Sequence, residues 1–116
     1  MKKQLVITFS DKKITKDGAY PARISRSWQV ANKVFIEYVT LETGEAFTKV
    51  FDADMTEGTR LWDEVVTIVG KSLAELADGE NFDMQKLAGL NCKLGLQRRT
   101  RVGGKESMTP GVVLAA

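Results

Sequence analysis

Apolar and polar residues alternate along much of the chain, which predicts a protein built mainly from β-strands. Residues 4–9 (QLVITF) are rich in β-branched and aromatic side chains and predict a first strand, ended by "SDKK" and "TKDG". Residues 18–30 alternate as well, with Ile24 and Trp28 on one parity and Arg23 on the other. Pro21 has no main-chain donor, so we expect it near the start or the edge of its strand.

The remaining strand signals lie on either side of a central segment. Residues 34–42 (VFIEYVTLE) are apolar on both parities, as expected of a central, strongly curved strand, and the short "TGE" turn makes residues 46–54 its antiparallel partner. Residues 87–102 return to strand periodicity. We expect residues 103–111 (GGKESMTPG) to form a flexible loop and residues 112–115 (VVLA) to close the chain as a last strand.

Between these two groups of strands the apolar period changes to that of an amphipathic helix. The apolar arc contains Leu61, Trp62, Val65, Val66, Ile68 and Val69, and the opposite arc contains Arg60, Asp63, Glu64 and Thr67. Thr56 or Thr59 can cap the start of this helix, and Gly70 is expected to end it. A short second helix is expected from Ser72, because "SLAE" has the spacing of a capping box.

The order of elements predicts a mainly β protein with the OB-fold, a small Greek-key β-barrel with one helix between its third and fourth strands. Residues 4–9 would add an N-terminal strand, and the helix would plug the open end of the barrel. We expect one domain over residues 1–116. Its parts are residues 1–17 (N-terminal strand and basic loop), 18–54 (first three barrel strands), 55–86 (helical segment) and 87–116 (last two strands and basic hairpin). Other small barrels and α+β sandwiches share this order.

Length and composition exclude several classes of protein. A chain of 116 residues supports one core, and its apolar runs are far shorter than the roughly 20 residues that cross a bilayer. The N-terminus lacks the pattern of a signal peptide, so we expect a cytoplasmic protein without membrane partners. The chain has no histidine, and Cys92 is its single cysteine, which excludes an internal disulfide, zinc sites and histidine-based catalysis.

The net charge of +2 conceals three blocks of opposite sign. Residues 1–35 hold eight Lys/Arg and two acids, residues 36–90 hold four and twelve, and residues 91–116 hold five and one, giving balances of +6, −8 and +4. If the blocks stay apart in space, the first and last strands form a basic surface with an acidic back. If the blocks mix, the charges only solvate the surface.

Catalysis has little support. The acidic pairs Asp52/Asp54 and Asp63/Glu64 could hold a hard cation, but no third acid or phosphate-binding loop accompanies them. Cys92 shares the apolar parity of its strand, so a core position is favoured over a nucleophile. We therefore predict no catalytic residue, no metal site, no cofactor and no enzymatic activity.

Nucleic-acid binding has more support, because cations and aromatic residues, which hold phosphates and stack on bases, occur together within the strands. The parity of Trp28 is compatible with the core and with a stacking surface, and the same alternatives are open for Tyr20, Phe47 and Phe51. In residues 87–102, Arg99 points outward with Lys93 and Arg101, whereas Arg98 falls on the apolar side. The candidate binding residues are Arg23, Arg26, Trp28, Lys49, Phe51, Lys93, Arg99, Arg101 and Lys105.

Three stretches also carry a resemblance to a known family. They are "GAYPARI" opening a strand, an F-x-K-x-F strand before the helix "RLWDEVVTIVGKSL", and "DMQKLAGLNCKLGL" leading into a basic hairpin. In these stretches residues 18–116 resemble phage-encoded single-stranded-DNA-binding proteins of OB-fold type. The resemblance implies a sequence-tolerant protein that coats single-stranded DNA during phage DNA replication and recombination.

The chain departs from the related bacterial proteins and leaves other functions open. It ends in apolar "GVVLAA" rather than an acidic tail, and Leu90 and Asn91 replace an expected Gly-Lys pair. A small structural or adaptor β-barrel that does not bind nucleic acid is the main alternative, and a metal-dependent nuclease using Asp52 and Asp54 is a remote one. The exposed edge expected at residues 5–9 predicts a homodimer formed by strand pairing. The pattern does not distinguish DNA from RNA.

Overall fold

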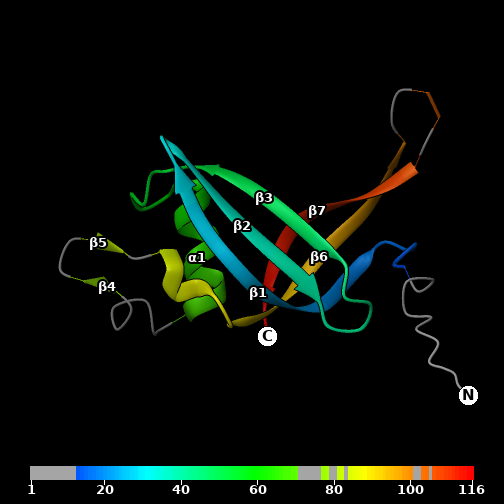
Figure 1. The fold of residues 1–116 in the computed structure, drawn as a ribbon, viewed down its shortest axis with the longest axis horizontal. Coiled ribbons are helices and arrows are strands. Elements are labelled where there is room, and N and C mark those ends of the chain that lie inside the picture. The colour runs from blue at the N-terminus through cyan, green and yellow to red at the C-terminus, as the bar shows by residue number, and fades with distance from the viewer. Residues whose placement is uncertain (1–12, 71–76, 79–80, 83, 101–102, 105) are drawn as a thin grey trace, which may run out of the picture.

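The computed structural model describes residues 13–70, 77–78, 81–82, 84–100, 103–104 and 106–116. Five long strands and one α-helix dominate them (Figure 1). They are β1 (Gly18–Val30), β2 (Lys33–Thr40), β3 (Ala46–Asp52), α1 (Arg60–Val69), β6 (Asn91–Thr100) and β7 (Glu106–Ala115). Between α1 and β6 lie the two-residue strands β4 (Ala77–Asp78) and β5 (Asn81–Phe82) and a 3-10 helix, η3 (Met84–Leu87). The strand predicted at residues 4–9 and the start of the second predicted helix lie outside the described residues.

The five long strands form one antiparallel sheet in the order β3-β2-β1-β6-β7. The sheet curls until β3 lies beside β7, which makes a nearly closed barrel. With α1 between the third and fourth barrel strands, this connectivity is that of a small OB-like barrel. The mainly β fold and the placement of the helix are therefore confirmed.

Strand β1 belongs to both halves of the barrel. Ala22 and Arg23 pair with β2 on one side and with β6 on the other. A β-bulge follows, because Ile24 pairs with Tyr38 and the next register pair joins Arg26 to Glu37. The extra residue exchanges the faces of the strand, since a bulge shifts the two-residue alternation by one.

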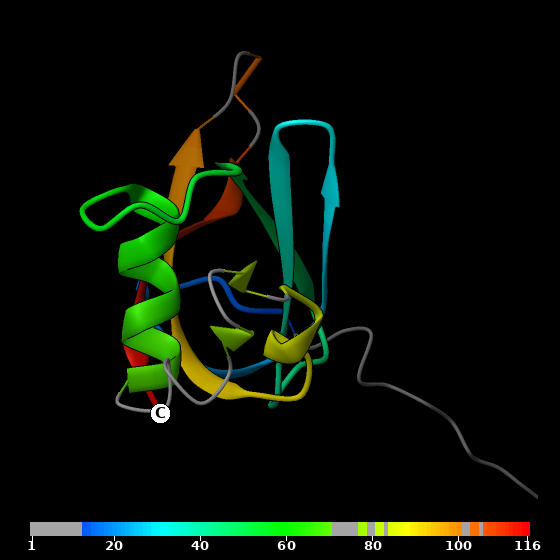
Figure 2. The ribbon, with the colours of Figure 1, turned by 90° about the vertical axis from the view of Figure 1, so that its left-hand side faces the viewer.

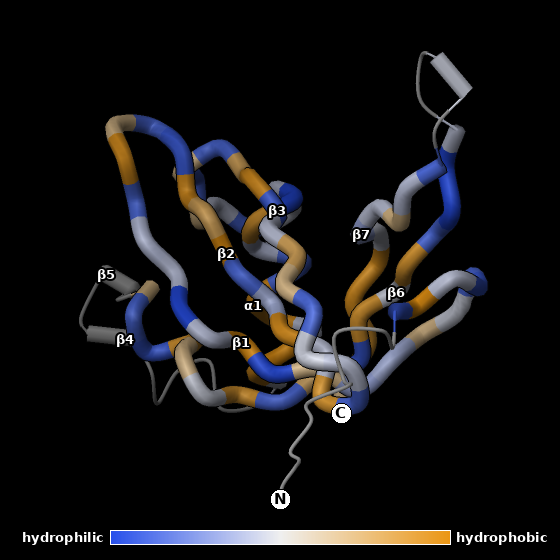
Figure 3. The backbone as a smooth tube through the Cα atoms, turned by 45° about the vertical axis from the view of Figure 1, so that its right-hand side comes forward, coloured by the Kyte–Doolittle hydropathy of each residue, from blue (hydrophilic) through white to orange (hydrophobic). Residues whose placement is uncertain are grey.

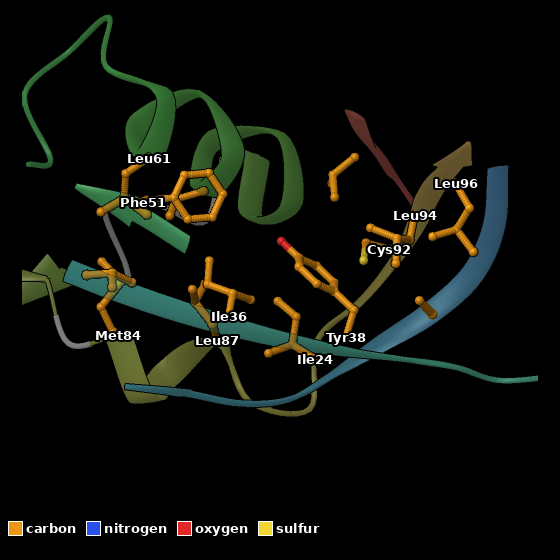
Figure 4. Close-up of a cluster of buried hydrophobic side chains, with 14 of the residues drawn as sticks. Ile24, Ile36, Tyr38, Phe51, Leu61, Met84, Leu87, Cys92, Leu94 and Leu96 are labelled. Atoms are coloured by element: carbon orange, nitrogen blue, oxygen red, sulfur yellow. The ribbon is translucent and has the colours of Figure 1, made fainter. Parts of the chain in front are cut away.

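Helix α1 covers the barrel where β3 and β7 meet (Figure 2). The Thr59 hydroxyl caps it by accepting a hydrogen bond from the Trp62 main-chain N–H at 3.2 Å, and Gly70 ends it with a φ of 63°, as the sequence predicts. Leu61 and Val65 enter the core from this helix. The largest fully buried side chains are Tyr38, Ile24, Ile36, Leu61, Leu87, Leu94, Leu96, Val34, Val65, Thr40 and Cys92, many of which appear in Figure 4.

The strands predicted at residues 34–42 and 46–54 each end two residues earlier, and two other predicted boundaries are wrong by more. Strand β7 begins at Glu106, so most of the expected loop at residues 103–111 is strand. Pro110 is tolerated there because it pairs with Leu96 next to a register shift, where a missing main-chain donor does not break a regular ladder. The predicted strand at residues 87–102 starts later, at Asn91, after the turn of η3. In Figure 3, β6 is hydrophobic in its middle and becomes hydrophilic towards the β6–β7 hairpin.

Candidate nucleic-acid interface

An aromatic platform lies on the outer face of the β1–β2 hairpin. Trp28 is the register partner of Phe35, and their rings stack with centroids 5.2 Å apart and planes 8° from parallel. The Arg26 guanidinium lies 4.4 Å from the centroid of the Trp28 ring, within the range of a cation–π interaction. We call Arg26, Trp28 and Phe35 the aromatic platform. Both rings are half-buried, so part of the platform meets solvent.

The bulge at Ser25 decides this placement. Ile24 is fully buried, and strict alternation would bury Trp28 with it. The extra residue instead turns Ser27 inward, where its hydroxyl donates to the main-chain carbonyl of Met84, and leaves Arg26 and Trp28 outside. Of the two positions that the pattern left open for Trp28, the structure has the one on the outer side of the strand, where the ring is half-buried.

Two further cations extend the surface from β1 onto β6. Arg23 is exposed and donates from Nε to Oδ1 of Asn91 at 3.3 Å. Lys93 is exposed as well, and since Pro21 pairs with Lys93 and Arg23 with Asn91, the two cations are diagonal cross-strand neighbours. Such neighbours are about 7–8 Å apart, so both cations lie on one stretch of the surface. Arg23, Lys93 and the aromatic platform together are termed the outer face below.

One acid lies within this surface. Glu37 is the register partner of Arg26, and its side chain is 22% exposed. Its Oε1 accepts from the Ser25 hydroxyl at 2.7 Å and lies 3.4 Å from Arg26 Nε. The charges of Arg26 and Glu37 therefore partly compensate each other on an otherwise basic patch.

Lys49 and Phe51 do not join the outer face, which corrects the prediction for these two residues. Phe51 is 4% exposed and packs in the core, because β3 turns it towards α1 (Figure 4). The Lys49 side chain is 11% exposed, and its ammonium group donates to both carboxylate oxygens of Glu64, at 2.8 and 2.9 Å. Neither side chain is therefore presented to an external strand.

Lys49 and Glu64 belong to a buried network that the sequence did not predict. Glu64 is 9% exposed although it lies on the polar arc of α1, and it also accepts a hydrogen bond from the Tyr38 hydroxyl. Burial, and next the charge of Glu64, raise the pKa of Tyr38 far above its usual range, so the hydroxyl stays a donor. The sequence did contain a signal for this network. Lys49 shares one parity with Phe47 and Phe51, and a cation buried between such residues needs an acid as its partner.

The two arginines at the end of β6, Arg98 and Arg99, lie on opposite sides of the strand, as their parity predicts. Arg99 is exposed and donates to Oε1 of Gln97 at 3.0 Å. Arg98 turns to the other side, where its Nε lies 3.5 Å from Glu106 and its main-chain N–H donates to Oδ1 of Asp17 at 2.7 Å. There it borders a pocket of about 460 Å³ at the mouth of the barrel, lined by Ile14, Phe47 and Met108 among others. Arg101 and Lys105 lie outside the described residues.

The remaining polar candidates have structural roles. Asp52 accepts from Lys33 at 2.5 Å, and Asp54 accepts from the Thr56 main-chain N–H at 2.9 Å. Hydrogen bonding to the Thr56 side chain, and next to its main chain, lowers the pKa of Asp54. Within the described ranges, no cluster of acids or cysteine is arranged to hold a metal ion. Cys92 is buried, and burial raises its pKa to about 11. No helix in the described part is long and apolar enough to cross a membrane.

Comparison with known proteins adds no further information on this surface. No protein-family model matches the chain, and no curated protein matches it. The function therefore has to be argued from the barrel, the aromatic platform and the cations beside it.

Proposed function

We propose that this protein binds single-stranded DNA with little dependence on sequence. The observation that carries the proposal is the Trp28–Phe35 stack on the outside of an OB-like barrel, with Arg26 over the ring. Aromatic rings are ordinarily buried, and a stacked pair at the surface offers the flat apolar area on which an unpaired base stacks. Arg23 and Lys93 on the neighbouring strands supply charge for the backbone.

The aromatic platform and the cations Arg23 and Lys93 would contact different parts of the DNA. The Arg26–Glu37 contact is long and the Arg26 side chain is 65% exposed, so the pair is weak and the guanidinium can turn from the ring to a phosphate. A base then takes its place on Trp28, while Arg23 and Lys93 neutralise phosphates further along the strand. Bases in a duplex are already paired and stacked, so the platform favours single strands.

The resemblance to phage proteins supports a proposal for the biological role. We propose that the protein coats displaced single-stranded DNA during phage DNA replication and recombination, in the cytoplasm of the host bacterium. It needs no cofactor and no catalytic group for this role, because coating requires contacts alone. The proposed form is a homodimer held by strand pairing of residues 5–9.

A salt titration of binding to single-stranded and duplex oligonucleotides tests the proposal. Single-strand affinity should fall steeply with salt, since each neutralised phosphate releases about 0.7 counterion. The double substitution Arg23→Gln/Lys93→Gln should lower the slope by roughly 1.4, whereas Lys16→Gln, near the barrel mouth, should leave it unchanged. Binding that is flat with salt, or equal for duplex and single strand, would contradict the proposal.

Exposed apolar residues on β7 favour a second candidate, a structural or adaptor protein. Val112 is 72% exposed and Leu114 is 48% exposed, and they share one parity of the strand. A protein partner or a second copy could cover them. If light scattering detects an assembly that Val112→Ser/Leu114→Ser disrupts while no oligonucleotide binds, this function replaces DNA binding.

A further inference from the structure

Glu37 borders the outer face and opposes a purely electrostatic role for it. Its carboxylate lies beside the platform, because Glu37 pairs with Arg26 and is two residues from Phe35 on the same face of β2. A negative charge at this place repels phosphates and lowers affinity for any strand. If binding depended on charge alone, a neutral residue at position 37 would give higher affinity.

The carboxylate is held in a defined position. The Ser25 hydroxyl donates to Oε1 at 2.7 Å, and Arg26 Nε approaches the same oxygen at 3.4 Å. Ser25 is the extra residue of the bulge, so the distortion that exposes Trp28 also supplies the donor that orients Glu37. Within the part of the chain that the structure describes, no hydrogen bond reaches Oε2 of Glu37. This oxygen is an available acceptor at the edge of a stacking surface.

An ionised carboxylate only accepts hydrogen bonds, so it distinguishes bases by the groups on their edges. Cytosine presents the N4 amino group as a donor, and thymine presents the O4 carbonyl oxygen at the same position. The amino group can donate to Glu37, whereas the carbonyl oxygen would face a negative charge. The two pyrimidines stack similarly, so their affinities would differ mainly through this contact.

We infer that Glu37 gives the outer face a preference for amino-bearing bases, with cytosine bound more tightly than thymine. The inference rests on the proposed function, since it places a base on the platform and assigns Glu37 to recognise the edge of that base. When Arg26 turns to a phosphate, the carboxylate loses its nearest cation and is free to accept from the base. The outer face then binds single strands of any sequence, with higher affinity where the base on the platform carries an amino group.

The test compares oligo(dC) with oligo(dT) of equal length at pH 7.5 and low salt, by fluorescence anisotropy. The wild-type protein should bind oligo(dC) about fivefold more tightly, the discrimination expected of a single well-placed contact. Glu37→Gln should bring the ratio near one, mainly by strengthening oligo(dT) binding, because the repulsion is removed. Glu42→Gln makes the same charge change in the exposed β2–β3 turn and should preserve the ratio.

The outcomes separate the inference from the proposed function. Salt-dependent binding with equal affinity for the two oligonucleotides, or a ratio that Glu37→Gln leaves unchanged, overturns the inference and leaves single-strand binding intact. Failure to bind either oligonucleotide at low salt overturns both. A thermal melt of Glu37→Gln that matches the wild type establishes that the change in ratio does not come from misfolding.

Discussion

Lys49 joins β3 to β7 by donating a hydrogen bond from its ammonium group to the main-chain carbonyl oxygen of Gly111, at 2.5 Å. No ladder between β3 and β7 is present in the described residues, so a side chain spans the place where the barrel would otherwise be open. The same ammonium group pairs with Glu64 from α1. One cation of β3 therefore contacts both β7 and α1 at the place where the barrel closes.

Replacing Lys49 should destabilise the protein strongly. Lys49→Met leaves the Glu64 carboxylate buried with the Tyr38 hydroxyl but without its cation, which should cost about 3 kcal/mol in the free energy of unfolding. Urea unfolding followed by tryptophan fluorescence measures this. The double variant Lys49→Met/Glu64→Gln should recover much of the loss, because no charge stays buried and the amide still accepts from Tyr38. A single variant as stable as the wild type would show that the pair is unimportant.

Two glycines on neighbouring strands should respond differently to alanine. A Cβ on Gly95 would lie 2.6 Å from the main-chain oxygen of Val112, a clash with backbone that cannot rotate away. Gly95→Ala should therefore lower the free energy of unfolding by about 1–3 kcal/mol. Gly111→Ala is the matched control, since its nearest neighbour would be 3.8 Å away, and it should be neutral or slightly stabilising. Equal effects in urea unfolding would show that β6 and β7 are not closely apposed here.

Trp28 should report DNA binding directly. Trp28→Ala should weaken single-strand affinity by roughly tenfold, because loss of one stacked base costs about 1–3 kcal/mol. In Trp62→Phe, the remaining emission comes from Trp28 and should be quenched when an oligonucleotide binds. Trp62 is half-buried on α1, away from the platform, so this variant should bind like the wild type. If the complex forms normally and the emission is not quenched, Trp28 does not contact the DNA.

The stability of the protein should fall in alkali. The pKa of Cys92 is raised from 9.0 to about 11, first by burial and next by the charge of Glu64. The folded state therefore retains the thiol proton longer than the unfolded chain does. Its contribution is complete below pH 9 and is lost as the pH rises towards 11, by up to about 1.4 kcal/mol per pH unit.

Urea unfolding at a series of pH values measures this decline. Cys92→Ala should flatten the curve between pH 9 and 10, while the raised pKa of Tyr38 continues to act at higher pH. In the native protein at pH 8, the buried thiol should react slowly with a thiol reagent and become reactive in urea. Fast reaction in the native state would show that Cys92 is accessible.

Local patterns were sufficient to predict most of the fold. Alternation predicted β1 with its observed bounds. The change of period and Gly70 predicted α1 and its end, and of the two N-cap candidates, Thr56 and Thr59, the structure has Thr59. These features are encoded by neighbouring residues, whose spacing alone determines them. The start of β7 was not predicted, because pairing with β6 orders a segment whose glycines and proline are typical of a loop.

The candidate site was predicted less completely, because its residues depend on contacts between distant segments. Counting parity from Ile24 could not assign a face to Trp28, since the intervening bulge depends on how β1 is shared between β2 and β6. Lys49 was mistaken for a surface cation because Glu64, its partner, lies on another element. Arg23 and Lys93 are exposed as their alternation indicated, whereas Arg26 shares the parity of Ile24 and is exposed because of the bulge.

The outer face is sensitive to chain length beyond the bulge in β1. Deleting Ser25 would only remove the bulge and keep Trp28 opposite Phe35. Deleting Ser27 would change no chemical group of the platform, yet it would place Trp28 opposite the buried Ile36 and turn its ring inward. No single substitution at either position has that effect. Insertions and deletions in this strand are therefore a more direct route than point mutations to gain or lose the aromatic platform.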